Sequence, residues 1–500
     1  MHGATYFAEL LSRVRAMERG DLLLFTDWRG DPDQRLDGPG TGVADVFCSA
    51  ARRGVHVGGL IWRSHMDRLA FSERENRHLG EDIEAAGGQC PLDMRVRPGG
   101  SHHMKLVVLR HASRPERDVA FVGGIDLCHS RRDDESHRGD PQPQPMAAVY
   151  GERPPWHDLQ AMIRGPAVGD VETVFRERWE DPAPLSRNPL HWLRDLTTGL
   201  DRHPSPLPPQ APDPLPCGTH AVQQLRTYPY RWAGYDFAPR GERSIARAYL
   251  KALPRARSLI YLEDQYLWSA QIAQVLAGTL RAHQDLHLVA VIPRFPDQDG
   301  RLSMPPNLIG REQALDLLQA AGGDRVAVYS PENAAGTPVY VHAKVCVVDD
   351  TWAIVGSDNF NRRSWTHDSE LSCAIMDCRE TAAGHTAAGA AGSGAADGPV
   401  TGTGTFAGQL RLALAREHLG GGIGTASLSG PAMFEAFRRS AAALDGWHAS
   451  GRRGARPPGQ LRSYPPPRLS AWTRAWAYLP YRVVYDPDGR PPAMRRARAF

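Results

Sequence analysis

The sequence contains very little lysine. Only Lys105, Lys251 and Lys344 occur, although lysine and arginine together number 59. Two of the three lysines follow a histidine by two residues, as His103-x-Lys105 and His342-x-Lys344. An ammonium group is a compact point charge, whereas a guanidinium group is a planar fork. These two positions therefore indicate a site that requires an ammonium beside an imidazole.

Cysteine and long apolar runs are also scarce. The seven cysteines include no Cys-x-x-Cys pair and no His-Cys cluster at ligand spacing, so a metal site has little support and free thiols of a reducing compartment are expected. No stretch reaches the roughly 18 apolar residues of a membrane span, and the N-terminal segment lacks a signal-peptide core. We expect a cytoplasmic monomer that uses no metal and no cofactor.

Charge is nearly balanced over the whole chain, but its C-terminal end is basic. Between residues 452 and 500, eleven arginines stand against two aspartates and are interleaved with Trp and Tyr. Anionic membrane interfaces select this mixture. The hypothesis is a peripheral membrane-docking tail, and the alternative is a tail that packs on the rest of the protein with solvated arginines. No extended basic groove with stacking aromatics is evident elsewhere, so no nucleic-acid partner is expected.

The two His-Lys pairs lie in similar surroundings. Each pair is followed by an apolar run, a turn, a second apolar run and a small-residue bend, Gly123-Gly124 or Gly356-Ser357. Upstream, residues 22–27 match 259–264, and residues 55–61 match 286–292. A repeat on this scale predicts two homologous lobes.

Within each lobe, short and nearly continuous apolar runs alternate with helix-length segments such as 43–53 and 272–282. Such runs are typical of strands buried on both faces, in sheets covered by helices. The sequence therefore predicts an α/β fold of two pseudo-twofold related lobes, with mixed, largely parallel sheets flanked by helices.

Composition divides the chain further. We expect an N-terminal lobe over 1–199, a Pro-rich linker over 200–217, a C-terminal lobe over 218–448 and a basic, aromatic tail over 449–500. Residues 381–405 are almost entirely Ala, Gly, Thr and Ser. Such a segment buries too little apolar area to order itself, so it is predicted to be a disordered insertion in the C-terminal lobe.

The second His-Lys pair is the start of a pattern that resembles the HKD motif of the phospholipase D superfamily. The residues that carry it are His342, Lys344 and Asp349, then Gly356-Ser357-Asp358-Asn359, and then Asp368-Ser369-Glu370. The first motif has His103 and Lys105 but carries Arg110 where the pattern has Asp. Segments 155–158, 165–179 and 261–266 are similar to plant-like phospholipases D, and the resemblance runs discontinuously from about residue 22 to residue 419.

The resemblance implies one active site at the lobe interface. The catalytic residues that it implies are His103, Lys105, Asp126, His342, Lys344, Asn359 and Glu370, with Asp349, Ser357 and Asp368 in supporting roles. It points to Glu370 as the carboxylate that orients His342, with Asp368 as the contender, and to Asp126 for His103. Asp349 is expected to support the fold of the site, so activity should survive Arg110. The Trp-His-Asp run at 156–158 is interpreted as a packing corner or a substrate contact.

These residue types suit the cleavage of a phosphodiester without a metal. The reaction needs a nucleophile, a proton donor for the leaving oxygen, and cations against the non-bridging oxygens. A neutral imidazole would attack phosphorus to form a phosphohistidine, while a protonated one would donate to the leaving alkoxide. By family habit, His103 attacks and His342 donates.

The resemblance therefore implies an enzyme of the phospholipase D type. Its expected substrate is a glycerophospholipid, whose headgroup ester it would hydrolyse to phosphatidic acid. A phosphatidyltransferase similar to cardiolipin synthases, which uses the same intermediate with an alcohol acceptor, is the first alternative. A nuclease and a lipid-binding relative impaired in its first motif are the remaining ones.

Overall fold

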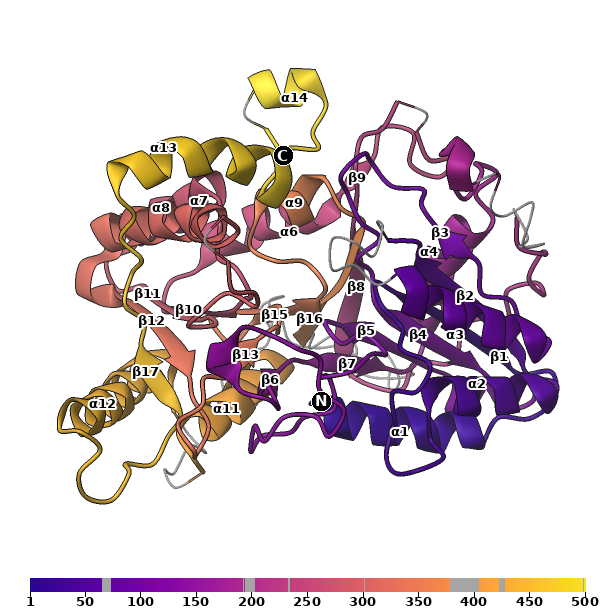
Figure 1. Cartoon of the computed structure of the whole chain (residues 1–500), viewed down its shortest axis with the longest axis horizontal. Coiled ribbons are helices and arrows are strands. Elements are labelled where there is room, and N and C mark those ends of the chain that lie inside the picture. The colour runs from indigo at the N-terminus through magenta and orange to yellow at the C-terminus, as the bar shows by residue number, and fades with distance from the viewer. Residues whose placement is uncertain are drawn as a thin grey trace, which may run out of the picture.

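The computed structural model describes residues 1–64, 73–191, 193, 203–232, 234–300, 302–377, 404–421, 428–497 and 499–500. Two sheets form the centre of the molecule, one in each half of the chain. Figure 1 shows the indigo and purple elements of the first half on the right and the orange and yellow elements of the second half on the left.

The N-terminal lobe contains a six-stranded sheet with the order β3-β2-β1-β4-β5-β7. Its strands are β1 (Leu22–Asp27), β2 (His56–Trp62), β3 (Leu92–Asp93), β4 (Leu106–Arg110), β5 (Val119–Gly123) and β7 (Gln160–Ile163). Its helices are α1 (Gly3–Arg15), α2 (Val43–Arg52), α3 (Glu73–Ala85) and α4 (Ala167–Trp179). Every residue of β1 is buried, as its continuous apolar run predicts.

The C-terminal lobe contains a nine-stranded sheet with the order β17-β12-β11-β10-β14-β15-β16-β8-β9. Its strands are β8 (His220–Tyr228), β9 (Glu242–Arg243), β10 (Leu259–Glu263), β11 (His287–Val291), β12 (Val326–Pro331), β14 (Val345–Val348), β15 (Trp352–Gly356), β16 (Glu370–Asp377) and β17 (Leu461–Ser463). Its helices are α6 (Ser244–Ala252), α7 (Ala270–Ala282), α8 (Met304–Gly322), α9 (Arg362–Thr366), α11 (Phe406–His418) and α12 (Gly430–Ala449).

The strand orders of the two sheets correspond where the sequence repeat predicts. β2-β1-β4-β5-β7 in the first sheet has the same pattern of parallel and antiparallel neighbours as β11-β10-β14-β15-β16 in the second. Even the register agrees, because Leu22 pairs with His56 and Leu259 pairs with His287. A short ribbon of β6 (Trp156–His157) and β13 (Tyr340–Val341) joins the two lobes.

Layers of helices cover the outer faces of both sheets, and a shared core lies between the sheets. On the outer face of the first sheet, α1, α2 and α3 pack through an apolar cluster that contains Phe7, Phe47 and Ile83. On the second, α7 and α8 pack through a separate cluster. A third cluster contains buried residues of both sheets, such as Val108 and Val345. The predicted α/β class with helix-flanked mixed sheets is confirmed.

The sheets are less parallel than expected. Only the β1-β2, β2-β3, β10-β11 and β11-β12 neighbours are parallel in the two large sheets, and the other pairs are antiparallel. The expectation of largely parallel sheets is therefore wrong. Part of the reason is local, since β4 is joined to β5, and β14 to β15, by short connections, which link antiparallel neighbours.

The predicted linker and insertion are described only in part. Residues 203–217 run without a helix or strand until the β8 region, and the guanidinium of Arg110 donates to the carbonyls of Ala211 and Pro212 at 2.8 and 2.7 Å. Residues 200–202 and 381–403 lie outside the described residues. Thr405, at the end of the predicted insertion, caps α11 by accepting from the amide of Gly408 at 3.0 Å.

Part of the predicted tail belongs to the C-terminal lobe. β17 lies in this segment and pairs antiparallel with β12, so it is an edge strand of the large sheet. The rest contains α13 (Ala471–Pro480), the short π-helical turn η7 (Tyr481–Tyr485) and α14 (Pro492–Arg496). Among the described helices, none combines the length and the apolar run that a membrane crossing needs.

Candidate active site

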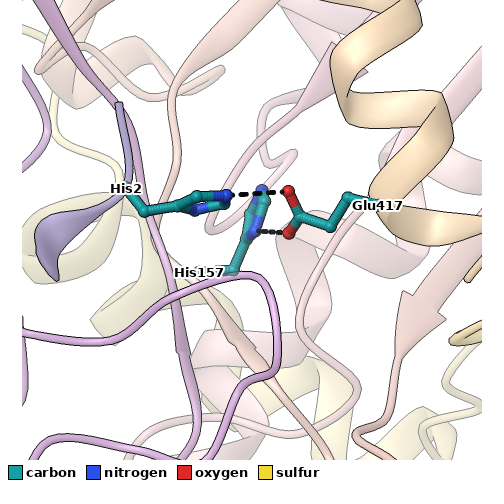
Figure 2. A group of neighbouring side chains, drawn as sticks. All are labelled: His2, His157 and Glu417. Atoms are coloured by element: carbon teal, nitrogen blue, oxygen red, sulfur yellow. Dashed lines mark ion pairs between the residues drawn. The ribbon is translucent and has the colours of Figure 1, made fainter. Parts of the chain in front are cut away.

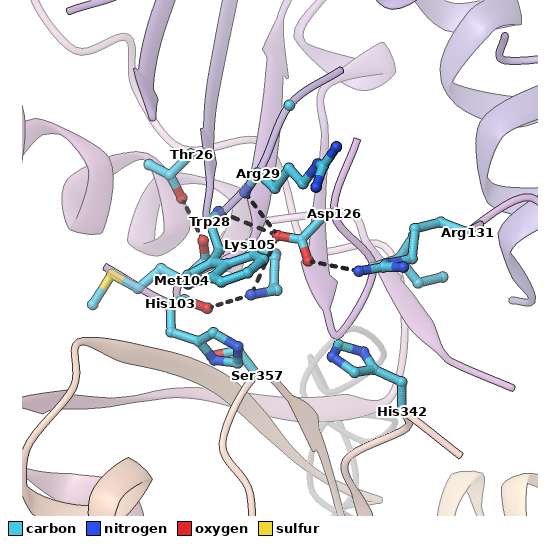
Figure 3. A network of polar contacts seen from close by, with 12 residues as sticks. Thr26, Trp28, Arg29, His103, Met104, Lys105, Asp126, Arg131, His342 and Ser357 are labelled. Carbon is cyan, nitrogen blue, oxygen red and sulfur yellow. Dashed lines mark hydrogen bonds and ion pairs between the residues drawn. The ribbon is translucent and has the colours of Figure 1, made fainter. Parts of the chain in front are cut away.

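The two His-Lys pairs lie at the lobe interface, directly before β4 and β14. Their position is at the carboxyl ends of the neighbouring strands β1 and β10, since Thr26 pairs with Leu106 and Glu263 pairs with Val345. Figure 3 shows the imidazole rings of His103 and His342 directed into the same region between the lobes. They are near enough for the charge of Lys344 to act on His103, and that of Lys105 on His342.

His103 receives its carboxylate from the C-terminal lobe. Its Nδ1 lies 2.8 Å from Oε2 of Glu370, the first residue of β16. The backbone is tied there too, because the amide of His103 donates to the carbonyl of Ser369 at 2.9 Å. The expectation that Asp126 orients His103 is therefore wrong.

His342 receives its carboxylate from the N-terminal lobe. Its Nδ1 lies 2.6 Å from Oδ2 of Asp158, just before β7. The amide of His342 donates to the carbonyl of His157 at 2.8 Å, next to the ribbon that joins the lobes. The expected pairing of His342 with Glu370, or with Asp368, is wrong because each ring faces the opposite lobe.

The sequence repeat held a signal for Asp158 that motif matching missed. β7 and β16 occupy equivalent places beside β5 and β15. Asp158 precedes the first of these strands by two residues, and Glu370 begins the second. A carboxylate at the start of each of these strands is thus the shared feature. The interpretation of 156–158 as a packing corner or substrate contact did not include this orienting role.

The two lysines differ in their partners. Nζ of Lys105 lies 3.3 Å from Oδ1 of Asp126 and donates to the carbonyl of His103 at 2.9 Å. Asp126 also accepts from the amide of Trp28 at 3.2 Å, so it fixes the lysine and a loop rather than the imidazole. Lys344 donates to Oε1 of Gln265 at 3.4 Å and to the carbonyl of His342. Burial lowers the pKa of Lys344 to about 8, despite the opposing effect of the Asp158 charge.

Two of the remaining predicted residues, Ser357 and Asp368, act on Glu370. Ser357 donates through Oγ to Oε2 of Glu370 at 2.5 Å. Asp368 accepts from the amide of Ser101 at 3.0 Å and from Nε of Arg363 at 2.7 Å, so it fastens a loop of the other lobe. Asn359 is 3% exposed, and its Oδ1 is without a hydrogen-bond partner in the described part of the chain. Burial and the Asp368 charge raise the pKa of Glu370 to about 8.

Arg110 and Asp349, the residues at equivalent positions of the two motifs, both serve the fold. The Asp349 carboxylate accepts from the amides of Arg257, Ser258 and Leu259, with N–O distances between 2.7 and 2.9 Å. In the first motif, Nε of Arg110 lies 3.3 Å from Asp118. The Asp118 carboxylate also accepts from the amide of His111 at 2.6 Å. Carboxylates from the following turn and from α4, Asp118 and Glu172, thus pair with the arginine that stands in this position.

The surroundings of both imidazoles favour their neutral form in the unliganded site. Burial, with the charges of Lys105 and Lys344, holds the pKa of His103 well below its ordinary value. Burial, with the charges of Lys344 and Arg131, does the same to the pKa of His342. A bound anion would oppose these cations and favour the protonated form of either ring.

Sequence reasoning missed a cation, Arg131, and an aromatic ring, Trp28, beside the histidines, and it gave Trp156 only as part of a packing corner or substrate contact. The guanidinium carbon of Arg131 lies 3.8 Å from the ring centroid of Trp156, and this ring lies 4.9 Å from the ring of His342. Trp28 meets His103 edge to face at 6.4 Å. Figure 3 shows Arg131 and Trp28 around the two histidines. No motif position marks Arg131 or Trp28, which the loops after β5 and β1 supply, whereas Trp156 lies in β6.

A buried His-Glu network lies behind His342. Nε2 of His157 lies 2.6 Å from Oε2 of Glu263. Figure 2 shows the other side of the ring, where Nδ1 of His157 lies 2.9 Å from Oε1 of Glu417 and Glu417 also pairs with His2 at 3.1 Å. Although burial opposes it, the charges of Glu263 and Glu417 raise the pKa of His157 well above its ordinary value. His2, His157 and Glu417 could hold a metal ion, as could His157, Glu263 and His418. The cysteine pattern gave no sign of either group.

Each His-Lys motif lies in a segment of the chain that matches a family model. A family model described as Phospholipase D matches residues 92–204, and one described as Cardiolipin synthase, PLD-like domain, matches residues 302–386. Phospholipase D alpha 1 of Oryza sativa subsp. japonica is 26% identical over an alignment that covers 68% of this chain and 56% of that protein. Phospholipase D alpha 1 of Arabidopsis thaliana is 27% identical with the same two coverages.

The chain thus spans little more than half the length of these relatives. Among solved structures, the phosphatidylserine synthase of Haemophilus influenzae Rd KW20 resembles it with a TM-score of 0.49 and 13% identity. That alignment covers 75% of this chain and 80% of the other.

Proposed function

The chain belongs to the phospholipase D superfamily, and we propose on that premise that it hydrolyses the headgroup ester of glycerophospholipids to phosphatidic acid. The observation that carries the proposal is the crossed arrangement of the histidines. Each Nδ1 is held by a carboxylate of the opposite lobe. This fixes the tautomers and leaves Nε2 of both rings for chemistry.

In the first step, Nε2 of His103 attacks phosphorus with its lone pair. The bond from phosphorus to the headgroup oxygen breaks, and its electron pair leaves on that oxygen. His342, protonated once the anionic substrate is bound, donates its Nε2 proton to the leaving oxygen. Lys105 and Lys344 stabilise the charge on the non-bridging oxygens. The products are a phosphatidyl-histidine and the free headgroup alcohol.

In the second step, His342 takes a proton from a water molecule, whose oxygen attacks phosphorus. The bond from phosphorus to Nε2 of His103 breaks, and its electron pair returns to the ring. Phosphatidic acid leaves, and both imidazoles regain their initial forms after one proton is released. Glu370 and Asp158 stabilise whichever ring is charged in each step.

A phosphatidyltransferase is the second candidate, because the match over residues 302–386 is to a description that names cardiolipin synthase. It would use the same intermediate and replace water with the hydroxyl of a lipid alcohol. A nuclease lacks comparable support. A catalytically impaired lipid-binding relative is disfavoured by the complete set of two histidines and two lysines.

The test incubates the full chain with mixed phospholipid vesicles and a primary alcohol, and reads the products by mass spectrometry. Phosphatidic acid with phosphatidyl-alcohol is the expected result, and the His342→Asn variant should form neither. Cardiolipin as the main product would favour the transferase. An absence of any headgroup release, with the protein folded, would leave lipid binding as the remaining candidate.

A further inference from the structure

α13 and η7 expose their large apolar side chains instead of burying them. The exposed fraction is 79% for Trp472, 69% for Leu479, 63% for Val483 and 58% for Val484, and Tyr478 adds a ring that is 46% exposed. A helix on a protein surface normally turns its apolar stripe to the core. Here the apolar side faces outward, over two consecutive elements.

The inward side of the same segment is held by a small residue, an ion pair and the ring of Tyr481, which packs against Trp268 and Ile309. Ala477 is the one buried residue among the ten of α13. Arg474 binds the Glu312 carboxylate of α8 through Nε at 2.9 Å and through a second guanidinium nitrogen at 2.7 Å. Tyr481 of η7 packs against Gly310 and donates to Oδ2 of Asp486 at 3.0 Å. Rotating the segment to bury its apolar side would break these contacts.

Unpaired cations accompany the apolar side chains. Arg482, Arg495 and Arg496 are exposed and have no carboxylate partner among the described residues. The guanidinium of Arg482 lies 5.9 Å from the ring centroid of Tyr478. Arginine beside exposed Trp, Tyr and aliphatic side chains is the combination that an anionic lipid interface favours.

The exposed segment is tied to loops that form the active site. Arg363 donates to the carbonyl of Val484 at 2.7 Å and to the carbonyl of Gly99 at 2.8 Å, while its Nε binds Asp368. Asp368 stands two residues before Glu370, the partner of His103. A single guanidinium therefore connects η7 to both lobes at the site.

A second exposed ring lies on a loop beside the C-terminal segment. Trp232 is 96% exposed. Arg97 holds its loop beside the C-terminal segment, because one guanidinium nitrogen donates to the carbonyls of Tyr230 and Gly489 at 2.6 and 3.2 Å. The loop of Arg97 continues directly into the first motif. Arg97 thus links the loop that carries Trp232 to the C-terminal segment.

We infer that α13, η7 and Trp232 form a docking face for a bilayer that contains anionic phospholipid. This inference rests on the proposed function, because a lipid-cleaving site must meet its substrate at a membrane surface. Insertion of Trp472, Leu479 and Val483 would bury apolar area that water now contacts. The arginines would bind the lipid phosphates around it, and Arg363 would hold the face beside the site.

Binding is measured with the full-length His342→Asn protein, so that turnover does not alter the vesicles. The vesicles are phosphatidylcholine with or without phosphatidylglycerol, and the readout is flotation. The Leu479→Glu/Val483→Glu double variant should weaken binding at least about tenfold, since it replaces buried apolar groups with anions at the interface. Leu215→Glu, at a leucine that is 85% exposed elsewhere, is the matched control and should bind as the parent does. High salt should weaken the binding of the parent.

Unchanged binding by the double variant, or an absence of parent binding to anionic vesicles, would overturn the inference. A parent dimer that the double variant converts to a monomer would overturn it in favour of a second copy of the chain. Turnover by the parent and the double variant with His342 intact distinguishes a failure of docking from a failure of the proposed function. With a short-chain phosphodiester below its micelle concentration, turnover tests the chemistry alone, and the ratio of vesicle to monomer turnover should fall in the double variant.

Discussion

The two half-sites of this protein differ more than their motifs suggest. The side chain of His103 is 15% exposed and makes an edge-to-face contact with Trp28. The side chain of His342 is 7% exposed and packs against the ring of Trp156, over which Arg131 lies. Lys105 has a carboxylate at 3.3 Å, but the hydrogen-bond partners of Lys344 within the described residues are an amide oxygen and a carbonyl. A duplicated motif thus preserves the imidazole and the ammonium group while their surroundings diverge, which suits the proposed nucleophile on one side and the proposed proton donor on the other.

The largest expected effect comes from removing either imidazole. His103→Asn and His342→Asn should each reduce turnover by about 10⁴-fold or more, because the roles of the two rings are not interchangeable. Steady-state headgroup release measures this. A residual rate within tenfold of the parent in either variant would mean that the half-sites act independently.

The next effect tests the crossed carboxylates. Asp158→Asn and Glu370→Gln should each lower kcat by about 10²–10³-fold with little change in KM, since each ring loses the group that fixes its tautomer and stabilises its charge. The Asp126→Asn variant sharpens the comparison, because it should disturb Lys105 and raise KM as well. If Asp126→Asn alone reproduced the loss of kcat, the original pairing of Asp126 with His103 would be restored.

A pH profile should then separate the two sides. Loss of the Glu370 proton, with a pKa of about 8, lets its carboxylate accept from His103, so kcat/KM should rise as pH approaches 8. Loss of the Lys344 proton, also with a pKa of about 8, removes a cation from the second half-site, so kcat/KM should fall above pH 8. Glu370→Gln should abolish the rising limb, and Lys344→Arg should move the falling limb to higher pH. Lys105→Arg is the control and should leave the falling limb in place.

The smallest effect on rate should come from the turns behind the motifs. Asp349→Ala removes a carboxylate that accepts three backbone amides, and Asp118→Ala removes the one that binds Arg110. Each should lower the free energy of unfolding by about 1–3 kcal/mol while kcat changes by less than about threefold. Thermal unfolding and initial rates check this. A large loss of kcat without a loss of stability would give Asp349 a chemical role.

Stability should also depend on pH through Glu370. Burial raises the pKa of Glu370 from 4.5 to about 8 in the folded protein. The stabilisation of the fold by the protonated carboxyl is therefore fully present below pH 4.5 and is lost as pH rises through 8. Glu370→Gln should therefore raise the free energy of unfolding at pH 9 by roughly 1 kcal/mol or more. Denaturant unfolding at pH 5 and pH 9 measures the difference, and an equal effect at both values would contradict the raised pKa.

Local patterns predicted much of the fold. The buried runs of β1 and β10 and the repeat itself located corresponding elements, because strand burial leaves a direct mark on residue type. The His-Lys spacing likewise marked the side chains that the fold brings together at the lobe interface (Figure 3). Strand direction was predicted less well, since apolar runs do not reveal whether the next strand returns by a short turn or by a helix.

The partners of the histidines could not be read from spacing. Glu370 is 267 positions from His103, and Asp158 is 184 positions from His342. Which lobe supplies a carboxylate depends on how the two sheets pack, and the pattern within one lobe does not contain that information. The same holds for Arg131, which lies over the ring of Trp156 beside His342.

The central claim is that both lobes act on one phosphorus atom through a covalent intermediate on His103. The direct test is mass spectrometry of peptides from the His342→Asn protein, quenched after reaction with a phosphodiester whose leaving group needs no proton. We predict a phosphatidyl adduct on the His103 peptide, absent from the His103→Asn protein under the same conditions. An adduct on the His342 peptide of the His103→Asn protein, or turnover of this substrate with no adduct on either histidine, would contradict the account.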